Sequence, residues 1–419
     1  MPAYARRQIV ATAEVGVYHC VARCVRRAFL CGKDAFTGRS FEHRKDWIRK
    51  RLEKLAGAFG IDVCGYTVMS NHLHVVLRIR PDLVQDWSEE EVAARWWMVF
   101  PQRFDSKGFP VEPEPEDLQA MIHNTAKQAE RRKRLASLSW FMRCLCEPIA
   151  RRANREDECT GRFWEGRFRS QALLDDAAIL ACSVYVDLNP VRAGVAKTPE
   201  ESEYTSARDR IESWHLRQHG VKPTGGKRLA DRRPSNRKSA GKLTSTAALA
   251  GEAPDGWLCE LTLNDGPLVR ANAIGTSPHA EPLPAQPRQI NTPQRTGSTP
   301  PHRSNPGSQS ATHPGETAAT IGRRASNKGF LPLRIDEYLK LLDWTGRSVR
   351  SDKRGAIPSE LAPILERLQV NGDNWVETVR NFGVWFKRAA GRAVSLADAA
   401  AGNGRQWFQG LAHAQSAFT

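Results

Sequence analysis

The sequence predicts an α+β fold built around a four-stranded antiparallel sheet. Four β-type runs lie within the first half of the 419 residues, up to about residue 215. Amphipathic helical patterns separate them in the order β-α-β-β-α-β, which is typical of an antiparallel sheet with helices on one face. A Pro- and Ser-rich stretch then separates this region from a second, helical one. The predicted divisions are residues 1–215, 216–328 and 329–419.

The first elements of the sheet region are a strand, a helix and then two further strands. "GVYHCVARCV", residues 16–25, predicts a strand. Residues 44–60 predict a helix, because Ile48, Leu52, Leu55 and Phe59 are spaced to lie on one face. "IDVCGYTVM" and "HLHVVLRI", residues 61–69 and 72–79, predict two strands that form a hairpin.

The remaining elements of this region follow an acidic, Trp-containing stretch, residues 81–116, which we interpret as an insertion. Residues 117–154 predict one long helix or a pair of helices. "GRFWEGRFRSQALL", residues 161–174, predicts a turn that leads into the fourth strand. Residues 175–189 predict an additional helix with Asp175 as its N-cap, ended by Pro190.

The second half of the chain has a different composition. Residues 216–328 are rich in Pro, Ser, Thr, Gly and Arg, and too little apolar area is present to offset the entropy of ordering. They predict a basic, disordered linker, in which "DGWLCELTL" is either a short strand or a docking segment. Residues 329–419 return to helical patterning and predict a small basic helical domain.

Charge and composition limit the classes of function. The formal charge is +16 and the pI about 9.7, which favours a polyanionic partner, either nucleic acid or an anionic membrane surface. No apolar run reaches the roughly 18 residues that a membrane span requires, and the N-terminus lacks the apolar core of a signal peptide. Nine cysteines without a CxxC pair indicate reduced thiols. We therefore expect a cytoplasmic protein that binds DNA or RNA, and no membrane.

Two pairs of residues are candidates for chemistry. His72 and His74 alternate with Leu73, so both point to the same side of their strand. They are either two ligands of one metal ion or a pair of surface or hydrogen-bonded histidines. Tyr185 and Asn189 are four residues apart on a predicted helix. The amide would be a metal ligand and the phenol a nucleophile, unless Tyr185 is an ordinary packed aromatic.

Three short sequence blocks support the interpretation of both pairs as a metal site with a nucleophilic tyrosine. "YTVMSNHLHVVL", "GRFWEGRFRS" and "YVDLNPVRAGV" together resemble the IS200-like single-tyrosine transposases. The resemblance covers about residues 15–210 and is strongest to the REP-associated tyrosine transposase branch of the HUH endonucleases. It implies a ferredoxin-like or RRM-like sheet (the HUH fold), a divalent metal bound by His72 and His74, and Tyr185 as nucleophile. Asn189 occupies the position of a polar third ligand.

The resemblance also implies an activity and partners. The activity is metal-dependent cleavage and rejoining of single-stranded or hairpin DNA through a 5′-phosphotyrosine, with Mg²⁺ or Mn²⁺ suited to the N and O donors and Zn²⁺ left open. The candidate DNA-binding residues are basic or aromatic: Arg162, Trp164, Arg167, Arg169, Arg131, Arg132, Lys133, Arg134 and Arg192. The plainer alternatives are a packed loop at 162–169 and a solvated helix face at 131–134.

Two other classes of function stay open. One is a DNA-binding regulator that retains the fold after its catalysis has decayed. The other is an RNA-binding protein with an RRM-like sheet, which the lack of an RNP1-type aromatic run disfavours. Both a monomer and a homodimer are compatible with the sequence, because dimers of the family place the tyrosine helix beside the partner's histidines. A DNA-cleaving protein would be associated with the nucleoid.

Overall fold

The computed structural model describes residues 14–25, 30–34, 37–219, 253–263, 321–349 and 361–418. It is a mixed α+β fold with a five-stranded open sheet in the order β2-β3-β1-β4-β5. The strands are β1 (Gly16–Arg23), β2 (Ile61–Val68), β3 (His72–Ile79), β4 (Arg169–Leu173) and β5 (Ala389–Ala390). The first four strands pair antiparallel, as the sequence predicts. The prediction of four strands is wrong by one: β5 pairs parallel with β4 and comes from a region in which only helices were predicted.

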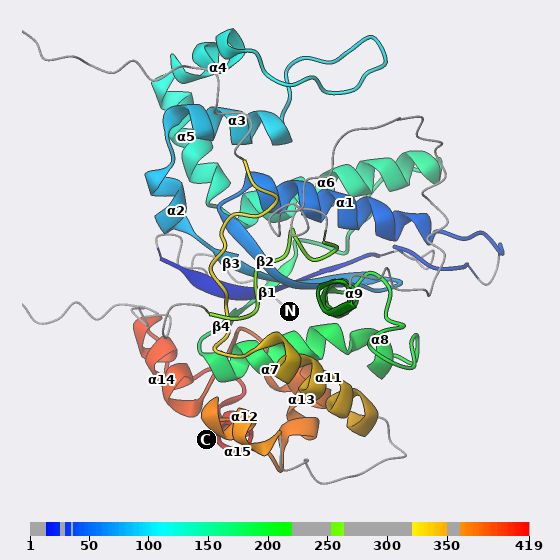
Figure 1. The fold of residues 1–419 in the computed structure, drawn as a ribbon, viewed down its shortest axis with the longest axis vertical. Helices are drawn as coiled ribbons and strands as arrows, with labels where there is room; N and C mark the ends of the chain where they lie inside the picture. The colour runs from blue at the N-terminus through cyan, green and yellow to red at the C-terminus, as the bar shows by residue number, and fades with distance from the viewer. Residues whose placement is uncertain are drawn as a thin grey trace, which may run out of the picture.

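Helices cover both faces of this sheet (Figure 1). α1 (His43–Ala58) and α6 (Leu138–Glu156) lie on one face, where their apolar side chains meet those of Tyr18, Leu73 and Leu77. α7 (Asp176–Asp187) lies on the other face, against Val17 and Val76. Period-2 alternation along β1 and β3 therefore assigns alternate residues to two separate buried clusters.

The predicted insertion at 81–116 forms a helical layer. It contains α2 (Pro81–Asp86) and α3 (Glu89–Val99), and α4 (Pro115–Ile122) begins at its end. With α5 (Thr125–Leu135) these helices stack beyond α1 and α6 (Figure 1). Residues 115–156 form the three helices α4, α5 and α6, and not the one or two that were predicted. Ser88 caps α3 by accepting from the Glu91 N–H, and Trp97 of α3 is buried.

Parts of the predicted linker 216–328 lie against the sheet. α9 (Ser206–His219) extends into it, and the structure also describes residues 253–263 and 321–328. Trp257 is fully buried, and the Cys259 N–H donates to the Val63 carbonyl of the edge strand β2 at 2.8 Å. The segment "DGWLCELTL" thus docks on this edge, which agrees with one of its two predicted roles and shields unpaired backbone groups. Residues 220–252 and 264–320 of the predicted linker lie outside the described residues.

The C-terminal helices share a core with α7. They are α11 (Ile335–Val349), α12 (Ala362–Arg367), α13 (Trp375–Trp385), α14 (Ala393–Gly402) and α15 (Leu411–Ala417). Val184 and Leu188 belong to the same buried cluster as Leu341 and Phe382. This differs from the separate domain predicted for 329–419. The physical reason is that α7 is apolar around most of its circumference, so both the sheet and a second layer must cover it.

None of the helices in the described part of the chain is both long enough and apolar enough to cross a membrane.

Candidate metal and tyrosine site

The strand register brings several polar side chains to the face of the sheet that α7 covers. Arg23 of β1 lies opposite His72 of β3, and Val21 lies opposite His74. One alternation further along β1, His19 lies opposite Val76 of β3 and Gln171 of β4. Since direct cross-strand partners share a face, these residues form one surface.

Both motif histidines have hydrogen-bond partners that the HxH pattern does not reveal. His74 is 4% exposed, and its Nδ1 lies 2.8 Å from Nε2 of His19. Its Nε2 lies 3.2 Å from Nδ2 of Asn189. His72 is half-buried, with its Nδ1 2.6 Å from Oδ1 of Asn71 and its ring centroid 4.8 Å from that of His74.

Asn189 and Tyr185 both reach His74, although the predicted helix 175–189 is not continuous. α7 ends at Asp187, and Asn189 begins the short helix α8 (Asn189–Arg192), in which Pro190 occupies the first turn. Asp175 caps α7 as predicted, by accepting from the Ala178 N–H at 2.9 Å. The ring centroids of Tyr185 and His74 are 5.8 Å apart. The structure therefore places all four predicted site residues in one cluster.

Tyr185 lies between the histidines and the C-terminal region. Its ring is 5.9 Å from that of His19 and 5.7 Å from that of Phe382, and the Arg192 guanidinium carbon lies 4.6 Å from its centroid. Burial raises the pKa of Tyr185 above its ordinary value, and the charge of Arg192 acts in the opposite direction. Nε of Arg192 is buried without a hydrogen-bond partner among the described residues.

The three imidazoles are held in the neutral form. Burial lowers the pKa of His19 to about 4, against the hydrogen bond to Gln171, which raises it. Burial and the nearby charge of Arg23 lower the pKa of His72 to about 4. The pKa of His74 falls well below its ordinary value, chiefly because of burial. Near neutral pH each ring has one N–H and one lone pair, which is the form that binds a metal ion.

The donor set fits a hard divalent ion. Two ligands of one octahedral Mg²⁺ or Mn²⁺ lie about 3 Å apart, and the amide of Asn189 is 3.2 Å from Nε2 of His74. Rotation of that amide would place its oxygen, the better ligand, where the nitrogen now lies. In the described ranges, no three His, Cys, Asp or Glu side chains are grouped to hold a metal. A metal held by His72 and His74 would therefore take its third protein ligand from another residue type, such as the amide of Asn189.

Residues 162–169 pack mainly through their aromatic side chains. Phe163 is 2% exposed, and the half-buried Trp164 donates from Nε1 to the Cys146 carbonyl at 2.9 Å. Arg162, Arg167 and Arg169 are exposed. Arg169 pairs with Val21 across β4 and β1, and so lies on the histidine face. This geometry is the packed loop of the plainer alternative, with three exposed guanidinium groups; DNA binding by these residues and Trp164 stays a prediction.

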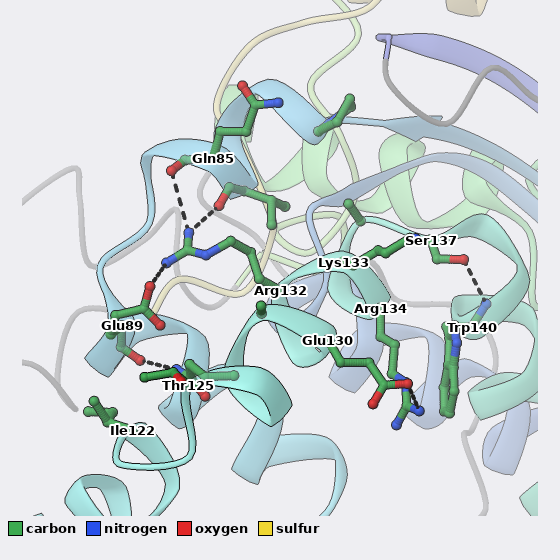
Figure 2. A pocket seen from close by; sticks show the side chains of 15 residues that line it. Gln85, Glu89, Ile122, Thr125, Glu130, Arg132, Lys133, Arg134, Ser137 and Trp140 are labelled. Carbon is green, nitrogen blue, oxygen red and sulfur yellow. Dashed lines mark hydrogen bonds and ion pairs between the residues drawn. The ribbon is translucent and has the colours of Figure 1, made fainter.

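The basic run 131–134 lies in the helical layer over the opposite face of the sheet. It borders an open pocket of about 970 Å³ between α2, α5 and the start of α6 (Figure 2). Arg131 donates to the Met121 carbonyl, Arg132 pairs with Glu89, and Arg134 pairs with Glu130 and lies over the ring of Trp140. Lys133 is exposed. Three of the four predicted phosphate contacts therefore have partners within the chain.

His19, Gln171 and Arg23 were not predicted as site residues. The alternation within residues 16–25 places His19 and Arg23 on one face, which is a usable signal. The sequence does not reveal that β1 lies between β3 and β4, and that neighbourhood alone brings His19 against both His74 and Gln171.

No protein-family model matches the chain, and no curated protein matches it. Among solved structures, the chain is similar to one described as "Structure of the REP associates tyrosine transposase bound to a REP hairpin". That similarity has a TM-score of 0.29 and 12% sequence identity, and covers 58% of this chain and 100% of the other.

Proposed function

We propose that this protein cleaves and rejoins single-stranded DNA through a covalent bond to Tyr185. The observation that supports this most strongly is the convergence of His72, His74, Tyr185 and Asn189, which come from β3, α7 and α8. The order of the first four strands, β2-β3-β1-β4, supports a ferredoxin-like or HUH-type sheet as the scaffold.

The roles of the residues follow from their chemistry. His72, His74 and Asn189 would bind Mg²⁺ or Mn²⁺, which when bound would stabilise negative charge on the scissile phosphate. Arg192, whose buried Nε has no hydrogen-bond partner in the described part of the chain, would bind a phosphate oxygen and favour the phenolate of Tyr185 through its charge.

The reaction breaks one bond and forms another. Oη of Tyr185 loses its proton to solvent and attacks phosphorus, and the bond from phosphorus to the 3′ oxygen breaks. The 3′ oxygen takes up a proton, which leaves a free 3′-hydroxyl and a 5′-phosphotyrosine. The covalent bond conserves the phosphodiester, so attack by another 3′-hydroxyl rejoins the DNA without ATP.

The surroundings favour a single strand bound by one chain. Arg23 and Arg169 lie on the histidine face, and Arg162 and Arg167 are exposed on the segment that precedes β4. These charges suit a DNA backbone, and the three sequence blocks imply hairpin DNA as the substrate. Tyr185 contacts His74 of its own chain, which supports cleavage in cis by a monomer.

The test is incubation with end-labelled hairpin and unstructured single-stranded DNA and Mn²⁺, followed by a denaturing gel. The expected result is a protein-linked DNA band that is absent with Tyr185→Phe, with His72→Ala and after EDTA. Tyr204→Phe is the matched control, because it removes a phenolic hydroxyl outside the site, and it should retain the band.

The competing function is DNA binding without chemistry. A mobility shift with no covalent product, for the parent protein over a range of hairpins, would support that function and contradict the proposal. Competition by RNA of the same sequence, at equal or higher affinity, would instead support an RNA-binding protein.

A further inference from the structure

His19 lies at the centre of the sheet beside the predicted metal ligands, but is not one of them. It is 5% exposed on β1, with Nε2 2.8 Å from Nδ1 of His74 and Nδ1 3.4 Å from Oε1 of Gln171. Gln171 is 6% exposed on β4. Burying two polar side chains between the sheet and the helices that cover it costs free energy unless they are paired, so their role requires an explanation.

The geometry of the His19–His74 contact is that of a hydrogen bond. The two ring planes are parallel within 9° and their centroids are 5.0 Å apart. Because the nitrogens are only 2.8 Å apart, closer than the roughly 3.5 Å between stacked ring planes, the rings lie edge to edge. The facing nitrogens point at each other, as in an N–H···N bond, whereas two ligands of one metal point at a shared third position.

The partners of the two outer ring nitrogens determine which of His19 and His74 donates in the hydrogen bond between them. Oε1 of Gln171 can only accept, so His19 donates from Nδ1 and its Nε2 has the lone pair. His74 must then donate from Nδ1 to His19, which leaves the lone pair on Nε2 of His74. That lone pair accepts from Nδ2 of Asn189. The reverse assignment would set an N–H of His74 against the Asn189 amide N–H and a lone pair of His19 against the Gln171 oxygen.

The tautomer of His72 is the same as that of His74, but a different hydrogen bond determines it. Its Nδ1 donates to Oδ1 of Asn71 at 2.6 Å, so its lone pair is also on Nε2. Both motif histidines therefore have the lone pair on the same nitrogen, Nε2. The half-buried His72 is held by its sequence neighbour, and the buried His74 by a chain of two side chains.

We propose that His19 and Gln171 are positioning residues that fix the tautomer and ring orientation of His74, so that Nε2 faces the metal. This inference rests on the proposed function for the presence of a metal, but not for the hydrogen-bond direction. A hydrogen bond to the second nitrogen of a metal-binding histidine is a general means of orienting the ring and raising its affinity.

The first measurement is the tautomer of His74 in the metal-free protein near neutral pH. Long-range ¹H–¹⁵N NMR on protein labelled at histidine distinguishes an Nδ1–H from an Nε2–H ring, and the signals are assigned by their absence from His74→Asn. We expect Nδ1–H for His74 in the parent. Gln171→Leu, which removes the acceptor at similar volume, should produce a mixture of tautomers. Gln171→Glu, which restores an acceptor, should return Nδ1–H.

The second measurement is the affinity for Mn²⁺, by titration without DNA. Gln171→Leu should weaken it by about 10- to 100-fold, and Gln171→Glu should restore most of it. Thermal unfolding of each variant separates this effect from misfolding, because a merely structural role would not be rescued in affinity by an acceptor alone.

The outcomes separate the two proposals. An Nε2–H ring for His74 in the parent, or parental Mn²⁺ affinity and tautomer in Gln171→Leu, overturns the role of His19 and Gln171. A parent that shows the Nδ1–H ring but forms no covalent product with DNA overturns the proposed function and supports the hydrogen-bond chain. Loss of the Nδ1–H ring together with Mn²⁺ affinity in Gln171→Leu supports the role directly.

Discussion

Arg192 contacts the proposed nucleophile, Tyr185. In the sequence it belongs to a turn after a helix. In the structure its guanidinium lies over the ring of Tyr185 and also donates to the Arg380 carbonyl of α13. It is therefore the one described cation in contact with the proposed nucleophile, and its charge lowers the pKa of Tyr185 against the opposing effect of burial.

Removal of this charge is expected to change the pH dependence of cleavage. The phenolate is the attacking form, so the rate should rise with pH until the pKa of Tyr185 is passed. Arg192→Gln removes a charge that lowers this pKa, and so the rise should move to higher pH, with about 10-fold less product at neutral pH. Arg192→Lys keeps the charge and should fall between the two. The measurement is single-turnover cleavage from pH 6 to 10; superimposable profiles for the parent and Arg192→Gln would contradict the assignment.

α7 is the element on which the site depends. Asp175 caps its N-terminus and also accepts from the Arg392 N–H at 2.7 Å, next to β5. At the other end, Asp187 accepts from Oη of Tyr338 at 2.6 Å. Each end of α7 thus accepts a hydrogen bond from the C-terminal region. Tyr185 lies near the last turn of α7 and packs against Phe382 of α13.

The contact between α7 and α13 leaves no room for a side chain at Gly383. A Cβ added there would lie 2.7 Å from Oη of Tyr185. Glycine to alanine within a helix normally stabilises by about 1 kcal/mol, so Gly383→Ala should change the unfolding free energy little while it displaces the hydroxyl. We expect a loss of covalent product of at least about 10-fold, because near-attack geometry tolerates little displacement.

The matched control is Gly322→Ala, whose added Cβ would meet no atom closer than 3.7 Å. Denaturant unfolding and the gel assay would be compared for both variants. Unchanged product formation by Gly383→Ala would show that the packing of α13 does not set the position of Tyr185.

The molecule as a whole folds around two buried clusters on opposite faces of one sheet. The cluster on the α7 face includes Val17 of β1 and Leu180 of α7 together with Phe382 of α13 and Ala390 of β5. Residues near the two ends of the chain thus contribute to one core, and β5 extends the sheet itself. Stability and site geometry should therefore depend on the entire C-terminal region.

A chain truncated after residue 219 is expected to lose its cooperative fold. Each large apolar side chain of α7 that loses its cover costs about 1.5–3 kcal/mol, and several such losses exceed a typical stability of about 5–15 kcal/mol. Circular dichroism during urea unfolding is the measurement. A deletion of 275–310, within the predicted linker, is the control and should leave the transition unchanged. A sharp parental transition in the truncated chain would contradict a shared core.

The local elements are those that the sequence determined by itself. Period-2 runs predicted β1 to β4, the spacing of Ile48, Leu52 and Leu55 predicted α1, and Asp175 is the N-cap of α7 as predicted. The predicted end of that helix at Pro190 is wrong, because α7 ends at Asp187 and Pro190 lies in the first turn of α8. These follow from interactions between residues a few positions apart, which the order of residues encodes directly. For the same reason His72 and His74 were correctly expected on one side of a strand.

The tertiary structure decided what those residues meet. The pairing of β1 between β3 and β4 brings His19 and Gln171 to His74, across up to 152 positions of sequence. β5, the docking of Trp257 and the packing of α13 on Tyr185 also depend on contacts between distant segments. The pattern of residues along the chain does not specify which distant segments pair, or in which register. Burial of complementary apolar faces, here that of α7, selects which segments come together.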